Sequence, residues 1–313
     1  MKVVSVTVNY KTADLTLRAV EAVLGDLDPL GGRALVVDNH SEDGSYEKLC
    51  AEVEKRGWSD RVEVFASGRN AGFGAGNNIA FRHALSWADP PEYFYLLNPD
   101  ALPDPGGMKA LVDFMDRTPD SGLAGSRVRH PGGELRLSAF RFPSVFSELE
   151  SGLKFGLASR LLDRWRVSMP APTQTCSVDW VSGASVMLRG AMLDEIGMFD
   201  ENFFLYFEET DLSLRAARAG WKTHYVMESG AEHIGQVSTG MKDKLKRRPK
   251  FWFESRAYYL EKNYGVALRK AADVAWAGGA LLPEVRKKLG RPDTDPPRLY
   301  RDFLAFNFGR GLD

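Results

Sequence analysis

Short hydrophobic runs alternate with amphipathic segments along the first hundred residues. Runs rich in β-branched and aromatic residues predict strands at 3–10, 34–39, 61–67 and 93–98. Apolar residues at helical spacing predict helices between them, at 15–24, 45–57 and 77–88. Because each strand is followed by a helix, the pattern predicts a mostly parallel α/β sheet with right-handed crossovers.

Beyond residue 105 the alternation becomes irregular. The predicted elements are a helix at 106–119, paired strands over 123–140 around a turn at 130–133, an amphipathic stretch at 145–168, a strand that enters and leaves a turn over 176–189, and a helix at 190–197. From about 240 the chain is basic, aromatic and helical in pattern. One large domain with a C-terminal extension is the expected organisation.

Composition narrows the class of protein. The 313 residues are 44% hydrophobic and 27% charged, which is typical of an ordered globular chain. A formal charge of −1 gives no general attraction to nucleic acid, so no nucleic-acid partner is expected. Two cysteines, Cys50 and Cys176, are too few for a disulfide framework, and residues 1–12 have the pattern of a strand and not of a signal peptide. We therefore expect a cytoplasmic protein.

Polar residues follow each predicted strand where it ends: "NYKT", "DNHSEDGS", "SGRNAGFGAGN" and "NPDA". In parallel sheets these ends share one edge, where ligands bind. Asp38 could accept a hydrogen bond from a ribose or a base, or its loop could simply cap the next helix. The glycines of "NAGFGAGN" allow close approach of a phosphate. However, the first strand-to-helix turn, "NYKTADL", has no glycine, which disfavours a nicotinamide enzyme.

Two further features carry carboxylates. Asp100, in "NPDA", suits magnesium or manganese, and its alternative is a solvated turn. Glu208, Glu209 and Asp211 lie at the start of a predicted helix that stops at Gly220, so their simplest role is to complement the helix dipole. The aromatic residues just before them, Phe203 to Phe207, are expected to form core and wall.

Taken in order, these motifs, with "WVSGASVMLR", "FDENFFLYFEETDLSLRAARAGW" and "EHIGQVST", resemble the family 2 inverting glycosyltransferases, most of all the bacterial rhamnosyltransferase-like branch. The resemblance covers about residues 3–240. It implies an α/β fold of the GT-A type, with a mostly parallel central sheet flanked by helices. Residues 1–240 would form the catalytic domain, with a nucleotide-binding half to about 105 and an acceptor-side half from 106. Residues 241–313 would form the helical extension.

The resemblance also implies roles for single positions. The metal, Mn²⁺ or Mg²⁺, would be held by Asp100 and His233, although a core or surface position is the alternative for a lone histidine. The expected nucleotide-binding residues are Val8, Asn9, Tyr10, Asp38, Ser41, Asn70, Gly72, Gly76, Asn77 and Asn98. The donor and acceptor would contact Trp180, Gly183, Ala184 and Glu208.

Catalysis would come from the acidic cluster. The family pattern is Glu-Asp-x-Asp with the second acid as base, and this chain has Glu-Glu-Thr-Asp, so Glu209 is the expected base, with Glu208 and Asp211 beside it. Glu209 is one methylene longer than the usual Asp, which keeps a catalytically impaired sugar-binding homologue as an alternative. A sugar nucleotidyltransferase is a further alternative, but it would need a Gly-rich basic loop after the first strand, and this chain has none.

The expected partners are a dTDP- or UDP-sugar, with dTDP-rhamnose first, and a glycan or lipid-linked acceptor of envelope polysaccharide synthesis. The segment 242–256, "KDKLKRRPKFWFESR", is basic and aromatic. It predicts either contact with the inner face of an anionic membrane or a solvated basic face with its aromatics packed inward. The helix predicted at 266–282 would pack on the domain or on a second subunit in a homodimer.

Overall fold

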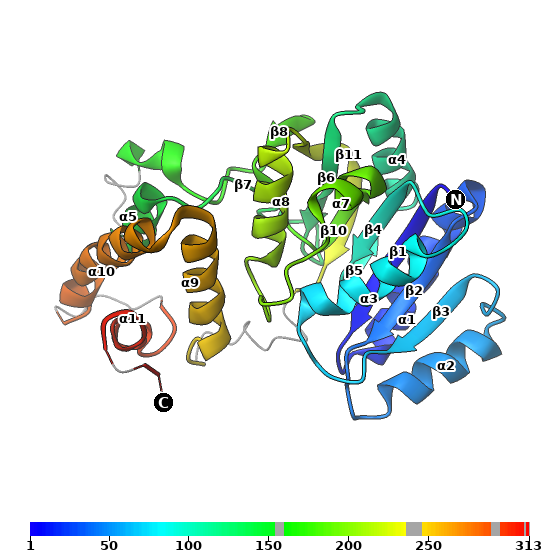
Figure 1. Cartoon of the computed structure of the whole chain (residues 1–313), viewed down its shortest axis with the longest axis horizontal. Helices are drawn as coiled ribbons and strands as arrows, with labels where there is room; N and C mark the ends of the chain where they lie inside the picture. The colour runs from blue at the N-terminus through cyan, green and yellow to red at the C-terminus, as the bar shows by residue number, and fades with distance from the viewer. Residues whose placement is uncertain (154–159, 236–245, 289–294, 310, 313) are drawn as a thin grey trace.

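Nine strands form the main sheet of the computed structural model, which describes residues 1–153, 160–235, 246–288, 295–309 and 311–312 (Figure 1). Along the sheet the order is β3-β2-β1-β4-β10-β6-β11-β5, and β8 pairs with β11. The strands are β1 Val3–Asn9, β2 Arg33–Asp38, β3 Val62–Ala66, β4 Tyr93–Leu97, β5 Ala101–Pro103, β6 Ser121–Arg129, β7 Ala139–Phe140, β8 Cys176–Val178, β9 Trp180–Val181, β10 Ser185–Arg189 and β11 Lys222–His233. The helices are α1 Ala13–Leu27, α2 Ser45–Lys55, α3 Phe73–Leu85, α4 Gly107–Arg117, α5 Val145–Leu153, α7 Gly190–Ile196, α8 Glu208–Arg218, α9 Lys250–Tyr264, α10 Val266–Lys288 and α11 Leu299–Phe308.

The first four strands are parallel, as the sequence predicts. Every residue of β1 is buried, because helices cover both faces of this part of the sheet. The parallel register pairs Asn9 with Asp38, so the polar ends of β1 and β2 lie side by side at one edge. On the other side of β4, the antiparallel β10 separates β4 from β6.

The predicted hairpin over 123–140 is largely absent. Strand β6 is bonded on one edge to β10 and on the other to β11, so neither edge is open to a hairpin partner. The returning chain makes one isolated bridge, between Arg129 and Leu135, and β7 then pairs with β9 in a separate two-stranded sheet.

Helix α3 begins at Phe73, four residues earlier than predicted, so most of the glycine-rich stretch is helical. Gly72, just before it, has φ +96°, and a Cβ there would lie 1.8 Å from the carbonyl oxygen of Phe204. Only glycine fits this contact. The close approach of Gly72 to Phe204 joins the start of α3 to residues 203–207, which lie mostly in bends ahead of α8.

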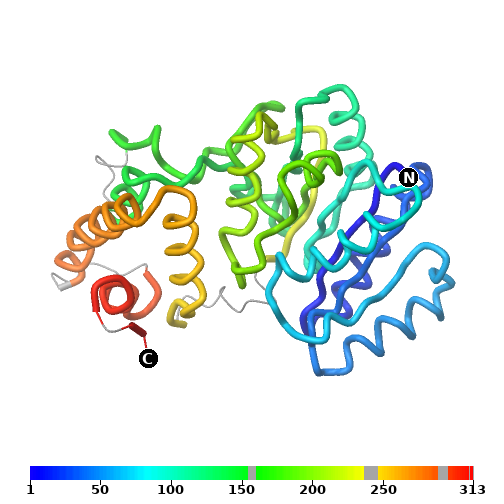
Figure 2. The backbone as a smooth tube through the Cα atoms, in the orientation of Figure 1, coloured from blue at the N-terminus to red at the C-terminus, as the bar shows by residue number. Residues whose placement is uncertain are grey.

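A helical lobe made of α5, α9, α10 and α11 lies beside the sheet (Figures 1 and 2). Its α5 falls inside the residues that the sequence assigns to the catalytic part. A Cβ on Gly152 of α5 would lie 2.5 Å from the carbonyl oxygen of Trp276, and one on Gly279 of α10 would lie 2.8 Å from that of Leu149. The two backbones therefore touch through glycines, and the lobe is built from two separate stretches of chain.

The basic and aromatic segment contributes to the interior of this lobe. Phe253 is buried against Phe303, and Arg256 is buried in ion pairs with Glu148 (2.8 Å) and Asp273 (2.7 Å). These contacts favour the alternative in which the aromatics pack inward, and residues 242–245 lie outside the described residues. Membrane association stays a prediction.

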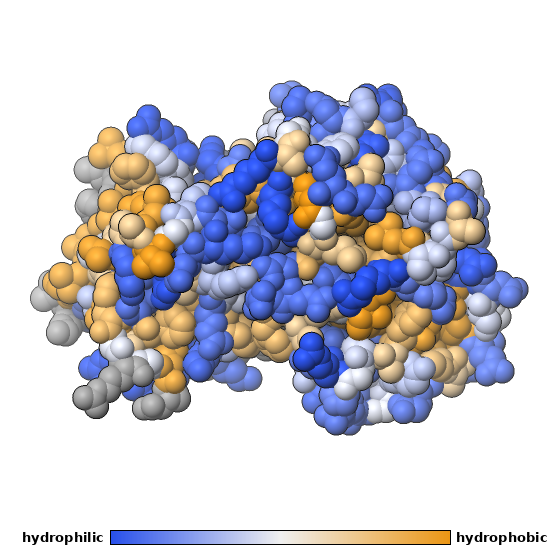
Figure 3. Space-filling view, viewed as in Figure 1, coloured by the Kyte–Doolittle hydropathy of each residue, from blue (hydrophilic) through white to orange (hydrophobic). Residues whose placement is uncertain are grey.

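Apolar surface gathers on the helical lobe in Figure 3. On α10 of this lobe, Val274, Leu281 and Val285 are exposed. Within the described ranges, no helix is both long and apolar enough to cross a membrane.

Candidate active site

One edge of the candidate site is built where β1 and β2 end. The side-chain amide of Asn9 donates to Asp38 Oδ1 (2.6 Å), and the Ser41 hydroxyl donates to the same oxygen (2.6 Å). Asp38 is buried, and with Ser41 it lines a cavity of about 510 Å³ that also contacts His40 and Gly68. A carboxylate that is fixed in this way at a strand end can receive a polar ligand without rearranging.

Asn9 also orders the chain that follows it. Its Oδ1 accepts hydrogen bonds from the Thr12 amide and hydroxyl and from Thr16 Oγ1, at 2.8 to 3.3 Å. Because the oxygen and the nitrogen of the Asn9 side-chain amide both make hydrogen bonds, Asn9 is itself held in place and positions Asp38. Next to Asn9, Val8 packs on α3, and Tyr10 is half-buried with the Lys11 ammonium 5.3 Å from its ring centre.

Hydrogen bonds of asparagine side chains hold the loop before α3 in place. Asn70 Oδ1 accepts from the Asn39 side chain (3.0 Å) and from the Gly72 backbone (3.1 Å). Asn77 donates to the Phe73 carbonyl (2.9 Å). A Cβ on Gly76 would lie 2.9 Å from Val8 Cγ1, so this glycine permits close packing of helix on strand. Here the sequence predicts phosphate contacts; the geometry gives Asn70, Gly76 and Asn77 internal roles, and their contact with a nucleotide stays a prediction.

The two predicted metal ligands lie together, although they are 133 residues apart in the chain. His233 Nε2 is 3.0 Å from Asp100 Oδ1 and 3.4 Å from Asn98 Nδ2. Pairing of β11 with β5 places His233 opposite Ala101, and this register brings the histidine to the end of β4. Both side chains are mostly buried.

This pair fits a divalent metal ion. The two atoms are 3.0 Å apart, which is a hydrogen-bond distance, and the carboxylate is a ligand type that suits Mg²⁺ and Mn²⁺. No group of three or more His, Cys, Asp or Glu side chains suited to a metal occurs in the described part of the chain. An ion held here would therefore need oxygen ligands from phosphates and water, as Mg²⁺ and Mn²⁺ commonly do.

The turn between β9 and β10 connects this pair to the acidic cluster. The Asn98 backbone donates to the Ala184 carbonyl (3.0 Å), so the end of β4 rests on the turn. A Cβ on the neighbouring Gly183 would lie 3.9 Å from Glu209 Oε1. Trp180, at the start of the turn, stacks on Phe140 with ring centres 4.1 Å apart.

Glu208 and Glu209 form the first turn of α8, as predicted, but in an unusual environment. Burial and the neighbouring Glu209 charge raise the pKa of Glu208 well above its usual range, and burial also raises the pKa of Glu209. Glu209 is only half-buried as a residue, yet its Oε2 is shielded from solvent. Within the described residues, Oε2 of each glutamate lacks a hydrogen-bond partner. A carboxylate in this state readily takes up a proton.

The Glu209 side chain lines a pocket between the sheet and the helical lobe. The pocket has a volume of about 400 Å³, and Trp180, Phe207, Trp252 and Arg248 are among the residues that line it. Ahead of α8, Tyr206 (φ +71°) and Phe207 (φ +70°) both have left-handed backbone conformations, which are strained for aromatic residues. Tyr206 stacks on Phe251 of α9, so the lobe holds the strained turn that presents Glu209.

Comparison with known proteins identifies the family. The model of "Glycosyl transferase family 2" matches residues 3–171, more than half of the chain, and that of "Glycosyl transferase family group 2" matches residues 156–282. The chain belongs to glycosyl transferase family 2. It is therefore a glycosyltransferase.

Relatives identify the branch of this glycosyltransferase. It is 29% identical over 219 residues to "N-acetylglucosaminyl-diphospho-decaprenol L-rhamnosyltransferase" of Mycobacterium tuberculosis (strain ATCC 25618 / H37Rv), which covers 66% of this chain and 67% of the relative. It is 26% identical over 172 residues to "Rhamnosyltransferase WbbL" of Escherichia coli (strain K12), covering 54% and 63%. The predicted rhamnosyltransferase-like branch is confirmed.

Solved structures confirm the GT-A-like fold of the glycosyltransferase. GalNAc-T7, in a complex with UDP, GalNAc and Mn²⁺, matches with a TM-score of 0.59 at 14% identity and covers 91% of this chain and 54% of its own. The mannosyltransferase PcManGT from Pyrobaculum calidifontis, in complex with GDP-Man and Mn²⁺, matches with a TM-score of 0.59 at 13% identity, covering 94% and 77%. At such low identity the likeness concerns the fold alone.

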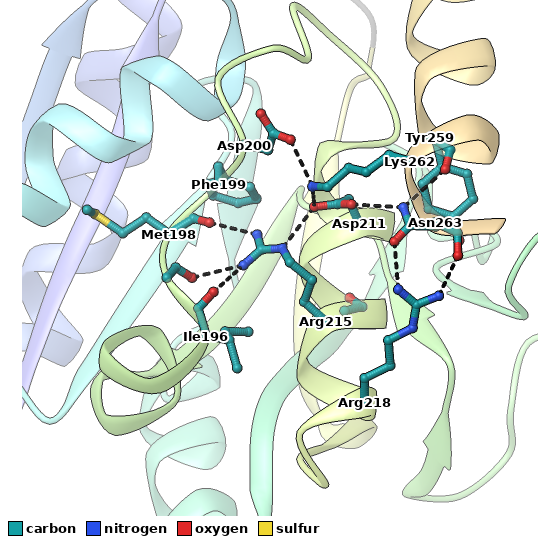
Figure 4. Close-up of polar contacts among 12 residues, drawn as sticks. Ile196, Met198, Phe199, Asp200, Asp211, Arg215, Arg218, Tyr259, Lys262 and Asn263 are labelled. Atoms are coloured by element: carbon teal, nitrogen blue, oxygen red, sulfur yellow. Dashed lines mark hydrogen bonds and ion pairs between the residues drawn. The ribbon is translucent and has the colours of Figure 1, made fainter. Parts of the chain in front are cut away.

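Asp211 of this glycosyltransferase occupies a different place from Glu208 and Glu209. It is fully buried on the side of α8 that faces α9 (Figure 4). Its carboxylate accepts hydrogen bonds from Arg215 Nε (2.9 Å), Lys262 Nζ (2.8 Å) and Asn263 Nδ2 (2.9 Å). The three acids are neighbours in the sequence. In the structure, the Asp211 carboxylate joins α8 to α9 of the helical lobe.

Replacement of Asp211 should therefore affect stability and not chemistry. Asp211→Asn removes a buried charge that three donors share, and we expect it to lower the free energy of unfolding by ~1.5–3 kcal/mol. Urea unfolding measures this loss, and transfer by the folded variant should stay within a few-fold of the native rate. Loss of transfer at unchanged stability would instead make Asp211 the base.

Two further residues support the site without a motif that marks them in the sequence. Asn78 donates to the Phe199 carbonyl (2.9 Å) and accepts from the Phe199 amide (3.1 Å), which ties α3 to the segment before α8. Arg136 Nη1 donates to the His233 carbonyl (2.9 Å). Burial lowers the pKa of Arg136, and the Asp100 charge opposes this shift. An asparagine inside a helix and an arginine in a loop can be assigned only after their partners are known.

Proposed function

We propose that this family 2 glycosyltransferase is a metal-dependent inverting enzyme. It would move rhamnose, or a hexose, from a nucleoside diphosphate to a lipid-linked or glycan acceptor during synthesis of a cell-envelope polysaccharide. The M. tuberculosis and E. coli relatives are both named rhamnosyltransferases, which supports a rhamnosyl donor. The M. tuberculosis relative's name also describes a sugar joined through a diphosphate to a polyprenol, which supports a lipid-linked acceptor.

One observation carries the proposal. The Asp100–His233 pair is joined through Asn98 and Ala184 to the Gly183 turn, and a Cβ on Gly183 would lie 3.9 Å from Glu209 Oε1. The proposed diphosphate site and the proposed proton acceptor would then both lie near a single turn. Inverting transfer needs these two functions on opposite sides of the reacting carbon.

In this arrangement the residues act as follows. Asp38 receives the nucleoside, and Asp100 with His233 would hold Mn²⁺ or Mg²⁺. When bound, that ion neutralises the charge of the leaving diphosphate. Glu209 takes the proton of the acceptor hydroxyl as its oxygen bonds to the anomeric carbon. The bond from that carbon to the diphosphate breaks, and its electron pair leaves with the diphosphate.

Trp180 would form the wall against which the acceptor sugar is held. Its ring is fixed by stacking on Phe140 and by a hydrogen bond from Nε1 to the Arg141 carbonyl (3.0 Å). A rigid aromatic face positions a sugar at little entropic cost.

A thermal-shift screen of dTDP, UDP and GDP, each with and without Mn²⁺, tests the proposal. A nucleotide present at 100 times its Kd should add ~2.7 kcal/mol to the stability of the folded state, and more with Mn²⁺ than without it. If none of the nucleotides raised the melting temperature under either condition, the donor site would be misassigned.

A further inference from the structure

The pocket at Glu209 contains a cation that neither the family resemblance nor the mechanism uses. Arg248 lines this pocket. Among the described residues, no carboxylate or carbonyl accepts a hydrogen bond from Arg248, and its Nε is shielded from solvent without a partner. Burial lowers the pKa of the Arg248 guanidinium. A half-buried arginine without an acceptor is costly, and a bound anion removes that cost.

Three other basic residues in the described part of this segment are already paired. Arg247 makes a two-point contact with Asp302, at 2.8 and 2.9 Å. Arg256 pairs with Glu148 and Asp273, as described above. Lys250 lies 3.3 Å from Glu254 on the exposed side of α9. Arg248 and Arg256 both line the pocket, and Arg248 differs from Arg256 in lacking an ion pair.

The orientation of Arg248 suits a phosphate. Its guanidinium carbon lies 4.9 Å from the centre of the Trp252 ring, which covers one face of the group. Stacking leaves the in-plane N–H groups available, and this fork matches phosphate oxygens. Of the carboxylates around the pocket, Glu148 is paired with Arg256, Asp295 attracts Arg248 electrostatically, and Glu209 is the base.

Much of the remaining wall of the pocket is apolar. It includes Pro143 and Val167 and, from the helical lobe, Trp276 and Leu299. An occupant that satisfies all of these surfaces has a hydroxyl for Glu209, an anionic group for Arg248 and a hydrocarbon part for the apolar wall.

We infer that Arg248 binds the phosphate of an amphiphilic acceptor, a sugar joined through phosphate or diphosphate to a lipid, and so selects anionic lipid-linked acceptors. This inference deepens the proposed function and depends on it for the role of the sugar. The helical lobe is then part of acceptor recognition, and the acceptor enters between the lobe and the sheet.

Binding of farnesyl diphosphate tests the inference without any transfer reaction. Titration calorimetry is done in EDTA with saturating UDP, so that the donor side does not compete for the diphosphate. Arg248→Gln should weaken binding at least tenfold, Arg248→Lys should restore part of it, and Lys250→Gln, a matched loss of charge outside the pocket, should change nothing. Farnesol, which has no phosphate, should bind weakly and equally to all four proteins.

The inference would be overturned if farnesyl diphosphate did not bind to the native protein. It would also be overturned if Arg248→Gln bound as tightly as the native protein, or if Lys250→Gln weakened binding as much as Arg248→Gln. Equal loss of farnesol and farnesyl diphosphate binding would assign Arg248 a purely structural role, which also contradicts it. Because no donor turnover is measured, failure of the proposed transfer reaction leaves this result unaffected, and the two failures can be told apart.

Discussion

Glu209→Gln is expected to lower the rate of sugar transfer by ~10²–10⁴-fold, the range typical of losing a general base. The amide keeps the size of the side chain and its position beside Gly183 but cannot accept the proton. Donor affinity should be unchanged, because Glu209 is on the acceptor side of the turn. Steady-state rates with a saturating acceptor, together with nucleotide binding by calorimetry, measure the two effects separately.

Two controls accompany this variant. Glu209→Asp, which restores the side-chain length usual in the family, should retain part of the rate. Glu254→Gln, which removes an exposed carboxylate of α9, should be native in both assays. If Glu209→Gln transferred at the native rate, the carboxylate would have no part in the chemistry.

The pH dependence of transfer follows from the environment of Glu209. Burial raises its pKa, so the rate should fall with decreasing pH at a midpoint above the ~4.3 of an ordinary glutamate. A raised pKa also means that the folded state binds this proton more tightly than the unfolded state. Ionisation of Glu209 therefore costs stability, and this loss appears as the pH rises through the raised pKa. Glu209→Gln should remove this contribution to both profiles.

Asp100→Ala should abolish the effect of Mn²⁺ on nucleotide binding. Asp100 and His233 would supply both protein ligands of the proposed metal, and a single histidine is a poor site for a hard ion. We expect the Mn²⁺-dependent part of the thermal shift with dTDP or UDP to disappear and the nucleotide affinity in Mn²⁺ to fall at least tenfold. Binding in EDTA should be unaffected.

His233→Ala should reduce the Mn²⁺-dependent thermal shift less than Asp100→Ala does, because the Asp100 carboxylate supplies the negative charge. Asp113→Ala, which removes a surface carboxylate paired with Lys109 on α4, is the matched control and should behave as the native protein. A full Mn²⁺ response in Asp100→Ala would mean that the metal binds elsewhere or that the protein does not use one.

The part of the sheet formed by the first four strands was largely predictable from the sequence because its order is local. Each strand, its helix and the polar residues at its end follow one another, so Asn9 and Asp38 could be expected at the same edge before their pairing was known. The glycine-rich stretch was harder to interpret. Gly72 and Gly76 are required by contacts with Phe204 and Val8, and neither partner is near them in the sequence.

The acceptor side depends on contacts between distant segments. Asp211 resembles its acidic neighbours in the sequence, and only the position of Lys262 and Asn263 on α9 shows that its carboxylate is paired with the helical lobe. Arg248 looks like one of many basic residues until the partners of Arg247 and Arg256 are known. The predicted hairpin at 123–140 failed for the same reason, because β10 and β11 occupy both edges of β6.

The central claim is inverting transfer with Glu209 as the base, and the anomeric configuration of the product tests it most directly. The protein is incubated with dTDP-rhamnose, Mn²⁺ and N-acetylglucosamine linked through diphosphate to a short prenyl chain, and the new glycosidic bond is assigned by NMR. The account predicts a product whose anomeric configuration is opposite to that of the donor, formed by the native protein and not by Glu209→Gln. A product that retains the donor configuration, or one formed equally well by Glu209→Gln, would contradict it.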